Sequence, residues 1–300
     1  MIAVTGSSGF IGKYLVNNTD KAVKAIVRKK SSYEIDCCSV LEADLNDPFL
    51  YKVFEKIDVV VHLAGLAHRE FTLNDFENNL ISFKNVIYSA SKENVKRIVY
   101  VSSVSMFEGH NAKISKDSIP SPATISSNYK LKSELLLKDL SKSLKIEFVI
   151  IRSPLVYGEG VKANFASLMR LVGKGLPLPF RAINKNKRSL VSLYNLVDLI
   201  EVCIDHPKAV NQVFLVSDDN DLSTSQMVTL MAKVQGKANL SIPVPLWCFK
   251  LVGKVFKKDA VVNRLVGSLQ LDIEHTKNTL DWVPPYTVEH GFELAAKNKG

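Results

Sequence analysis

Short apolar runs alternate with longer segments of helical periodicity through the first half of the chain. The apolar runs are rich in β-branched residues and lie at 2–5, 23–27, 59–63, 97–102 and 147–151. A helical pattern begins at Ile11, directly after the first run. Such alternation is typical of parallel strands joined by right-handed helical crossovers. It predicts an α/β fold with a Rossmann-like, doubly wound parallel sheet.

The alternation ends beyond Arg152. Prolines and glycines interrupt the pattern at 154–160 and 175–179, and substrate-binding loops are commonly built in this way. One more strand is expected at 213–216. One more helix is expected at about 223–235, because suitable capping residues stand at its start.

This change of pattern divides the chain into two regions. Residues 1–160 are expected to form a dinucleotide-binding Rossmann domain. Residues 161–300 are expected to form mainly a smaller C-terminal substrate-binding lobe, with some segments at about 190–220 returning to the sheet. With 300 residues and a hydrophobic content of 46%, the chain is long enough to bury a full core.

The turn after the first apolar run, TGSSGFIG at 5–12, is the most informative motif. Gly6 permits a tight turn, Gly9 lets the backbone approach a phosphate, and Gly12 lets the following helix lie close to the strand. The free N–H groups and the positive end of that helix attract an anion, most often a dinucleotide pyrophosphate. An ordinary strand-to-helix turn is the alternative. The cofactor contacts expected here are Gly6, Ser8, Gly9, Phe10, Ile11 and Gly12.

Composition and charge narrow the function classes only slightly. The net charge of +9 suits an anionic ligand, but it is also common where basic residues merely maintain solubility. The basic residues are scattered without interleaved aromatic residues, so nucleic acid is not an expected partner. The cysteines lack the spacing of a metal site and are too few to cross-link the chain, which predicts no metal and a reducing cytoplasm. They are Cys37, Cys38, Cys203 and Cys248.

The sequence shows neither a secretory signal pattern nor an apolar run of membrane-spanning length. We therefore expect a cytoplasmic protein without an integral membrane segment. Residues 246–258 mix apolar and basic residues at helical spacing, which is compatible with the surface of an anionic membrane. Packing of this helix on the body of the protein is the interpretation that we favour at this point.

Further motifs follow the glycine run, and together they are specific. They are ADL at 43–45, VHLAG at 61–65, VSS at 101–103, KL with SE at 130–134, and IRSPLVYG at 151–158. In this order they resemble the extended short-chain dehydrogenase/reductases, the family of the nucleotide-sugar epimerases, dehydratases and reductases. The segments 157–165, 177–180, 186–191 and 195–199 resemble a narrower branch of bacterial reductases and epimerases. Enzymes of that branch act on UDP-linked amino- or deoxy-sugars used in surface polysaccharide synthesis.

The resemblance implies cofactor contacts beyond the glycine run. An acidic residue of the family contacts the adenine ring, and the end of a strand lies against the cofactor. A lysine of the family contacts the ribose. Carried onto this sequence, these contacts fall on Asp44, Leu45, Leu63, Ala64, Gly65, Lys130 and Pro154.

Hydride transfer between a sugar C4 and a nicotinamide requires an acid/base at the sugar oxygen, a hydroxyl that shares the proton, and a cation. In the family these are tyrosine, serine or threonine, and lysine. Ser103 fits the hydroxyl role and a substrate contact, because ligands lie at the carboxyl ends of strands in open α/β sheets. The alternatives are a strand-ending serine bonded to backbone, or Ser105 in the same role.

The chain departs from the family at the tyrosine. The family motif places a tyrosine four residues before the lysine, and when that lysine is Lys130 the tyrosine position holds Ser126. A serine hydroxyl is far less acidic than a phenol. Tyr129 lies nearly one turn later on about the same face, but Ser133 stands where its lysine is required, with Lys132 one position earlier.

Three explanations of this departure remain open. Tyr129 takes the acid/base role, with Ser103 and Lys130 as its partners. Alternatively, the protein has weakened or lost its hydride-transfer chemistry and keeps its ligand sites. In the third explanation the substrate needs less acid/base assistance.

The residues after the second predicted strand bear on the choice of cofactor. An acidic residue there would bind the adenosine ribose of NAD, whereas this chain has Arg28-Lys29-Lys30. A guanidinium suits a 2′-phosphate by charge and by its fork geometry, so NADP(H) is favoured over NAD(H). The alternative is a set of solvated loop cations.

For the substrate, the resemblance implies that Asn164 and Arg188 hold the diphosphate and uridine of a sugar nucleotide, and Arg264 is a candidate second cation. A salt bridge from Arg188 to Asp198 is the alternative. We expect an NADP(H)-dependent reduction of a UDP-4-keto-sugar at C4, in a chain that pairs as a homodimer in the manner of the family. A UDP-sugar 4-epimerase is the first alternative, and a catalytically weakened cofactor- or sugar-nucleotide-binding protein is the second.

Overall fold

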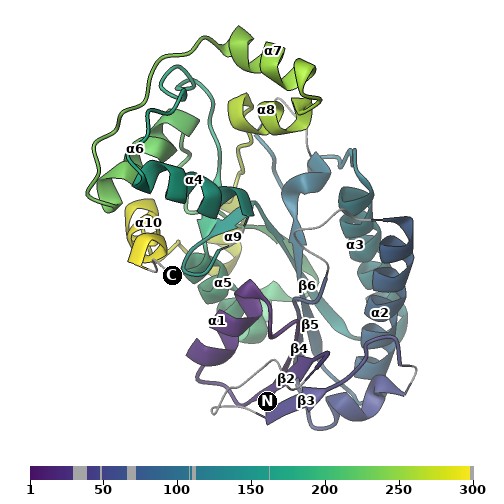
Figure 1. Ribbon diagram of the computed structural model, residues 1–300. Coiled ribbons are helices and arrows are strands. Elements are labelled where there is room, and N and C mark those ends of the chain that lie inside the picture. Colours follow the sequence, from purple (N-terminus) through teal and green to yellow (C-terminus); the bar gives the residue numbers. More distant parts are fainter. Residues whose placement is uncertain are drawn as a thin grey trace.

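The computed structural model describes residues 1–29, 39–47, 49–65, 72–107, 109, 113–161 and 163–297, without the side chains of 163, 164 and 260. Its centre is a parallel sheet of seven strands in the order β3-β2-β1-β4-β5-β6-β9, with helices on both faces (Figure 1). The strands are β1 (Ile2–Thr5), β2 (Val23–Val27), β3 (Ser39–Glu42), β4 (Val59–His62), β5 (Arg97–Ser103), β6 (Glu147–Ser153) and β9 (Gln212–Leu215). The predicted fold class is therefore confirmed.

The strand order reverses beside β1. The chain moves outward from β1 through β2 to β3, then crosses to β4 on the other side of β1 and continues outward. At such a switch point the loops after β1 and β4 diverge, which opens a crevice at the carboxyl edge of the sheet. The two loops are the predicted glycine run and the residues that follow His62.

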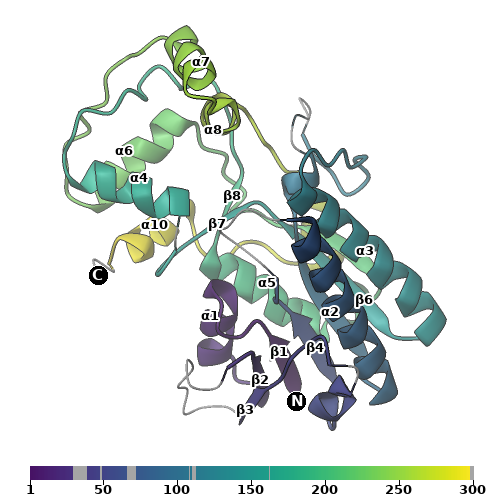
Figure 2. The same ribbon diagram turned by 45° about the vertical axis from the view of Figure 1, so that its right-hand side comes forward.

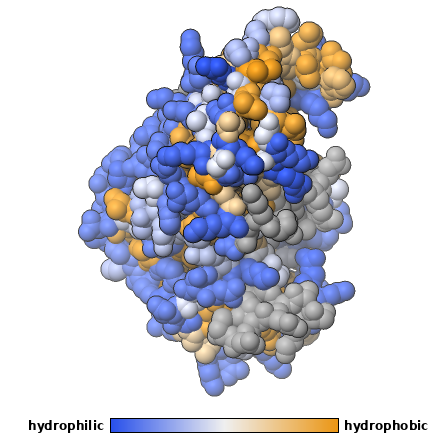
Figure 3. Space-filling model, turned by 60° about the vertical axis from the view of Figure 1, so that its left-hand side comes forward, coloured by the Kyte–Doolittle hydropathy of each residue, from blue (hydrophilic) through white to orange (hydrophobic). Residues whose placement is uncertain are grey.

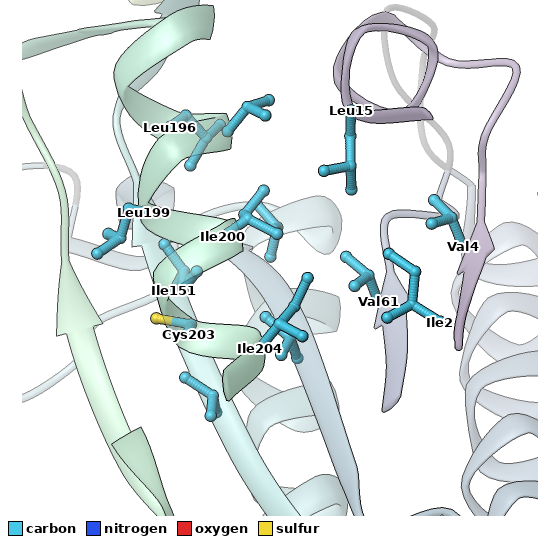
Figure 4. Close-up of a cluster of buried hydrophobic side chains, with 14 of the residues drawn as sticks. Ile2, Val4, Leu15, Val61, Ile151, Leu196, Leu199, Ile200, Cys203 and Ile204 are labelled. Atoms are coloured by element: carbon cyan, nitrogen blue, oxygen red, sulfur yellow. The ribbon is translucent and has the colours of Figure 1, made fainter. Parts of the chain in front are cut away.

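One face of the sheet is covered by α1 (Phe10–Asn18) and α5 (Leu193–Asp205). Apolar side chains recur along α5 at the spacing of one helical face, and they meet Leu15 of α1 above the strands (Figure 4). Those of α5 in this cluster are Leu193, Leu196, Val197, Leu199, Ile200, Cys203 and Ile204.

The opposite face is covered by α2 (Leu73–Lys92), α3 (Ile125–Leu144) and the short 3-10 helix η2 (Leu50–Phe54). Thr72 and Thr124 cap α2 and α3, and each accepts a hydrogen bond from the backbone three residues later. Phe83 and Leu137 are fully buried over the strands. The first two turns of α3 carry Ser126 and the predicted catalytic residues Tyr129 and Lys130.

A smaller lobe stands beyond the carboxyl edge of the sheet (Figure 2). It contains the strand pair β7 (Leu155–Tyr157) and β8 (Leu190–Ser192), and α4 (Ala163–Gly173), α6 (Thr224–Val234) and α10 (Val288–Lys297) around their own apolar cluster. The remaining elements are η3 (Val104–Phe107), η4 (Pro207–Ala209), α7 (Leu246–Val255), α8 (Asp259–Val266) and α9 (Glu274–Leu280). The division at residue 160 stays a prediction.

A buried polar network joins this lobe to the sheet. The Tyr157 hydroxyl donates a hydrogen bond to Asp218 Oδ2 at 2.7 Å, while Asn195 Nδ2 and the Ser192 backbone N–H donate to Asp218 Oδ1 at 2.6 and 2.8 Å. Burial raises the pKa of Asp218, and these hydrogen bonds oppose the rise. Segments from β7, β8, α5 and the loop after β9 thus meet at one carboxyl group.

The helix at 246–255 packs on the rest of the protein through one side, as expected, but leaves its other side open. Among the described residues of α7, only Gly253 is fully buried, and most of the large apolar side chains face outward. Figure 3 shows hydrophobic residues gathered at the top of the molecule, where α7 lies in Figure 1. Within the described part of the chain, no helix is long and apolar enough to cross a membrane.

A buried ion pair fixes α3 on the sheet. Arg152 of β6 binds Glu134 of α3 through its Nε, at 3.1 and 3.2 Å from the two carboxylate oxygens, and through Nη2 at 2.8 Å. Both side chains are almost fully buried, and the guanidinium lies 5.2 Å from the ring centroid of Phe107. Because Glu134 follows Lys130 by one helical turn, this pair also sets the register of the residues near the start of α3.

Removal of one partner from this pair tests its importance. Glu134→Ala leaves the Arg152 charge buried without its partner, so we expect the free energy of unfolding to fall by about 3–5 kcal/mol. Urea denaturation followed by circular dichroism measures the change. The control is Asp117→Ala, which removes one partner of the exposed Lys116–Asp117 pair and is expected to cost less than about 1 kcal/mol. A loss equally small for Glu134→Ala would contradict the role given to this pair.

Candidate active site

The glycine turn lies directly against the end of β4. Gly6 has φ of +72°, and a Cβ at this position would lie 2.6 Å from the backbone nitrogen of Ala64 and 2.7 Å from the carbonyl carbon of Leu63. The Leu63 N–H donates to the Thr5 carbonyl at 3.0 Å. Only glycine fits this close approach of two backbones, so Gly6, Leu63 and Ala64 are brought together at the switch point.

Gly12 meets the same turn from the other side. A Cβ at Gly12 would lie 2.4 Å from the Gly6 carbonyl oxygen, while Ser7 ties the turn to β2 by donating from its Oγ to the Ile26 carbonyl at 3.0 Å. The N-cap of α1 is Gly9, which provides no side chain to cap the helix. The first N–H groups of α1 therefore face the crevice without a side-chain cap, and this cradle fits a dinucleotide pyrophosphate.

The residues expected near the adenosine lie at the ends of β2 and β3. Arg28 is exposed directly after β2, and Asp44 is exposed in the turn after β3, where its Oδ1 accepts a hydrogen bond from the Asn46 N–H at 3.0 Å. The Leu45 carbonyl accepts a hydrogen bond from Asn85 Nδ2 at 3.2 Å. Lys30 lies outside the described residues. Arg28 and Asp44 thus lie at the ends of β2 and β3, where the adenosine is expected.

Lys130 occupies the crevice edge between α3 and β5. Its Nζ donates to the Val101 carbonyl at 3.3 Å and lies 5.1 Å from the ring centroid of Tyr100. Burial lowers the pKa of Lys130 to about 8, and the negative charge of Glu134 opposes this shift. An amine in this range exchanges protons near neutral pH, which an ordinary lysine does not.

Tyr129 points into the packing of α3 rather than toward solvent. It is 2% exposed, its ring centroid lies 6.3 Å from that of Phe76 on α2, and the Lys130 Nζ lies 5.8 Å from the ring centroid. Burial raises the pKa of Tyr129 to about 12, while the nearby Ser133 hydroxyl acts in the opposite direction. Lys132 is exposed on α3. The acid/base role of Tyr129 stays a prediction, and a phenol with this pKa remains protonated near neutral pH.

Ser126 and Ser103 complete this part of the site. Ser126 is half-buried in the first turn of α3, one turn before Lys130 on the same face. Ser103 ends β5, is half-buried, and its Oγ accepts a hydrogen bond from the Ser105 N–H at 3.1 Å. The Ser103 hydroxyl is therefore bonded to backbone, as the alternative of a strand-ending structural serine predicts. Because its oxygen is the acceptor in that bond, the hydroxyl can still donate its own proton to a ligand.

Sequence reasoning gave no role to His62. His62 is fully buried at the end of β4, with its Nδ1 2.8 Å from the Thr5 hydroxyl and its ring stacked on Phe83 at 4.4 Å. Burial, and then the charge of Lys130, lower the pKa of His62 to about 3. It remains neutral at physiological pH. The signal that could have found it is its position at the end of an apolar strand, one residue before the predicted cofactor contact Leu63.

The predicted substrate cations lie farther along, beside α8. Arg188 donates from Nη1 to the carbonyl oxygens of Arg264 and Gly267, at 2.7 and 3.2 Å. Asp198 instead accepts a hydrogen bond from Trp282 Nε1 at 2.6 Å. The Arg188 side chain is therefore held by the backbone at the C-terminal end of α8, the helix that carries Arg264, and among the described residues Asp198 pairs with Trp282. The side chain of Asn164, on α4, lies outside the described residues.

Comparison with known proteins identifies the family. Residues 2–217 match the NAD dependent epimerase/dehydratase family. The chain is 44% identical to a UDP-glucose 4-epimerase of Vibrio cholerae, over 99% of this chain and 94% of that protein. The chain belongs to the NAD-dependent epimerase/dehydratase family. The predicted resemblance to nucleotide-sugar epimerases and reductases is thereby confirmed.

More distant relatives share the fold. The chain is 24% identical to N-acetyl-alpha-D-glucosaminyl-diphospho-ditrans,octacis-undecaprenol 4-epimerase of Escherichia coli O157:H7, over 97% of this chain and 93% of that protein. Among solved structures, the UDP-glucose 4-epimerase of Thermotoga maritima with UDP-glucose superposes with a TM-score of 0.79 at 21% identity, covering 99% and 97% of the two chains. The UDP-glucuronic acid 4-epimerase of Bacillus cereus in complex with NAD gives 0.79 at 19% identity, covering 98% and 95%.

The lowered pKa of Lys130 predicts a stability that depends on pH. A buried lysine with a folded pKa of about 8, against about 10.5 when unfolded, costs stability below pH 8 and ceases to do so above pH 10.5. Lys130→Met removes this cost, so we expect it to raise the free energy of unfolding at pH 7 by about 1 kcal/mol, a value reduced for partial solvent access.

The measurement is urea unfolding from pH 7 to pH 10.5. The wild-type chain is expected to gain stability over this range relative to Lys130→Met. Lys132→Met, an exposed neighbour on the same helix, is the matched control and is expected to follow the wild type. If Lys130→Met were less stable than the wild type at every pH, the assigned electrostatic cost would be wrong.

Proposed function

We propose that the protein is a nucleotide-sugar 4-epimerase that works with a bound nicotinamide cofactor on a UDP-linked hexose. The observation that carries the proposal is the 44% identity to the Vibrio cholerae UDP-glucose 4-epimerase over almost the whole of both chains. This similarity supports the epimerase alternative over the net reduction that the sequence favoured. The cradle of Gly6 and Gly12 supports a cofactor-dependent reaction, because no side chain fits where they lie.

We assign the cofactor contacts to residues at the carboxyl edge of the sheet. The N-terminus of α1 would hold the pyrophosphate, Asp44 and Leu45 the adenine, and Leu63 to Gly65 the face of the cofactor at the switch point. Lys130 would hold the nicotinamide ribose. When bound, the nicotinamide would supply hydride transfer from and to the sugar C4.

The proton at the C4 oxygen needs its own carrier. A group that removes and returns this proton works best with a pKa near the working pH, and Lys130 has a pKa of about 8. In the proposed reaction the neutral amine of Lys130 takes the C4 hydroxyl proton through the Ser103 hydroxyl as the hydride leaves C4. The 4-keto sugar then rotates in the site to present its opposite face. Lys130 returns the same proton to the C4 oxygen as the hydride returns to C4. Tyr129, held protonated by burial, remains a neutral neighbour.

The substrate nucleotide is proposed to lie toward the smaller lobe. Arg188 is held by the backbone at the C-terminal end of α8, the helix that carries Arg264, and guanidinium groups bind phosphate oxygens in bidentate fashion. Asn164 on α4 is proposed as a further contact of the diphosphate and uridine. This arrangement would leave the sugar between the nucleotide site and the carboxyl end of β5.

The decisive test follows what happens to the sugar nucleotide and to the nicotinamide cofactor. The purified chain, supplied with nicotinamide cofactor and UDP-glucose or UDP-N-acetylglucosamine, is expected to produce the C4 epimer with no net change in the reduced cofactor. Chromatography of the sugar nucleotides and nicotinamide absorbance measure the two quantities. Net oxidation of NADPH with a UDP-4-keto-sugar would establish the reductase instead. Binding without turnover would establish the weakened binding protein that Ser126 suggests.

Three variants in the same assay separate the roles on α3. Lys130→Met is expected to lower kcat by about 100-fold or more, and Tyr129→Phe by less than about threefold. Ser126→Tyr restores the family spacing and is expected to raise kcat and to shift its pH profile away from the Lys130 value. A loss of about 100-fold in Tyr129→Phe would return the acid/base role to Tyr129.

The cofactor preference is proposed to be NADP(H), although the Bacillus cereus neighbour is in complex with NAD. Arg28 is exposed at the end of β2, where its guanidinium would meet a 2′-phosphate. Arg28→Ala is expected to weaken NADPH binding by about tenfold, the loss of one charge-assisted contact, and to leave NADH binding unchanged. Fluorescence titration with both cofactors measures this. Equal affinities in the wild-type chain would contradict the preference.

A further inference from the structure

The helix α7 exposes an unusual concentration of large apolar side chains. Trp247, Leu251, Val252, Val255 and Phe256 are all between 54% and 68% exposed, and they fall within ten consecutive residues. Single exposed apolar residues are normal on a protein surface, but a contiguous apolar patch marks a binding surface. The five side chains form what we call the α7 band.

The spacing within the α7 band makes it continuous. Trp247, Leu251 and Val255 are separated by four residues each and form one row along the helix, and Val252 and Phe256 form a second row beside it. On the other side of the first row, Lys250 and Lys254 form a parallel row of charge. Lys257 and Lys258 follow at the end, and residues 246–258 contain no acidic residue.

The opposite side of α7 is attached to the rest of the protein. Gly253 is buried, and a Cβ in its place would lie 2.8 Å from the Val262 side chain of α8. The Lys258 N–H donates to the Gly253 carbonyl at 2.7 Å, and Phe249 stacks on Phe180 at 6.2 Å. These contacts fix the helix with the α7 band directed outward, at the end of the molecule opposite the N-terminus (Figure 2).

We propose that α7 binds the surface of an anionic lipid membrane. A helix that lies in a bilayer interface buries an apolar face, places lysines beside that face, and anchors through tryptophan at the headgroup level. All three features are present in α7, and the lysine row is complementary to anionic headgroups. The inference does not depend on the proposed function, because it concerns a surface that none of the proposed catalytic groups occupies.

The charges argue against the other occupants. A second copy of this chain, packed α7 against α7, would bring the lysines of the two helices close together, which is electrostatically unfavourable. An acidic protein segment would satisfy the lysines, but ion pairing alone gives no reason for five exposed apolar side chains. A lipid surface accounts for both the apolar side chains and the lysines.

Flotation of the full chain with vesicles tests the proposal. We expect binding to vesicles of phosphatidylglycerol and phosphatidylcholine, and at least tenfold weaker binding to phosphatidylcholine alone. The chain contains two tryptophans, of which Trp282 is only 5% exposed, so Trp247 reports on the contact. Its fluorescence is expected to shift to shorter wavelength with anionic vesicles, and Trp247→Phe is expected to abolish that shift.

Matched variants distinguish α7 from general attraction by a basic protein. Leu251→Glu with Val255→Glu is expected to reduce vesicle binding at least tenfold, whereas Phe49→Glu with Ile119→Glu, at exposed apolar positions elsewhere, leaves it unchanged. The charge reversals Lys250→Glu with Lys254→Glu are expected to have the same effect as the α7 apolar variants. Their control is the pair Lys208→Glu with Lys237→Glu, which are exposed outside α7.

Several results would overturn the proposal. Absence of binding to anionic vesicles would do so, as would an equal loss of binding in the variants and their controls. In another outcome the wild-type chain does not bind vesicles but self-associates in sedimentation. If Leu251→Glu with Val255→Glu abolished that self-association, the α7 band would be assigned to contact with a second copy of the chain. Circular dichroism of each variant confirms that the fold is retained.

Discussion

The ion pair between Glu134 and Arg152 is the interaction on which the candidate active site depends. It is buried and bidentate, so it fixes both the distance and the rotation of α3 over β6. Lys130 lies one turn before Glu134 and therefore meets the Val101 carbonyl at the carboxyl end of β5. At the switch point, the close approach of Gly6 to Ala64 leaves the two backbone segments equally little room to move. The crevice is thus bounded by two rigid contacts, one ionic and one steric.

Between those contacts lie Tyr129 and Lys130, two of the predicted catalytic residues, next to each other on α3. Burial acts in opposite directions on two adjacent residues: it raises the pKa of Tyr129 and lowers that of Lys130, because it disfavours the charged form of each. Near neutral pH the Tyr129 phenolate is therefore rarer, and the neutral Lys130 amine more common, than in exposed side chains of these types. Lys130, one helical turn after Ser126, therefore places a titratable amine near the carboxyl end of β5.

The sequence predicts the buried parts of this molecule well and its surfaces poorly. The strands at 2–5 and 23–27 have the bounds that were predicted, because their side chains are mostly apolar and buried, with Lys24 as the one charged residue among them. The mostly exposed β3 carries no buried apolar run and was missed. The burial of Tyr129 and the outward direction of the α7 band depend on tertiary packing, which periodicity alone does not determine. The glycine motif predicted the close backbone contacts of Gly6 and Gly12, but the motifs contain no information on the direction of a side chain at a position that differs from the family.

The network around Asp218 has a consequence for movement of the smaller lobe. Tyr157, Ser192 and Asn195 all donate to this one buried carboxyl group, and Asn195 also exchanges hydrogen bonds with the backbone of Tyr286. A hinge rotation of the lobe as a rigid body would break the bonds from Tyr157 and Ser192 at once and leave the desolvated Asp218 carboxyl with Asn195 as its donor from α5. Access for a ligand must therefore come from local motion of loops, while the lobe itself remains docked and preorganised.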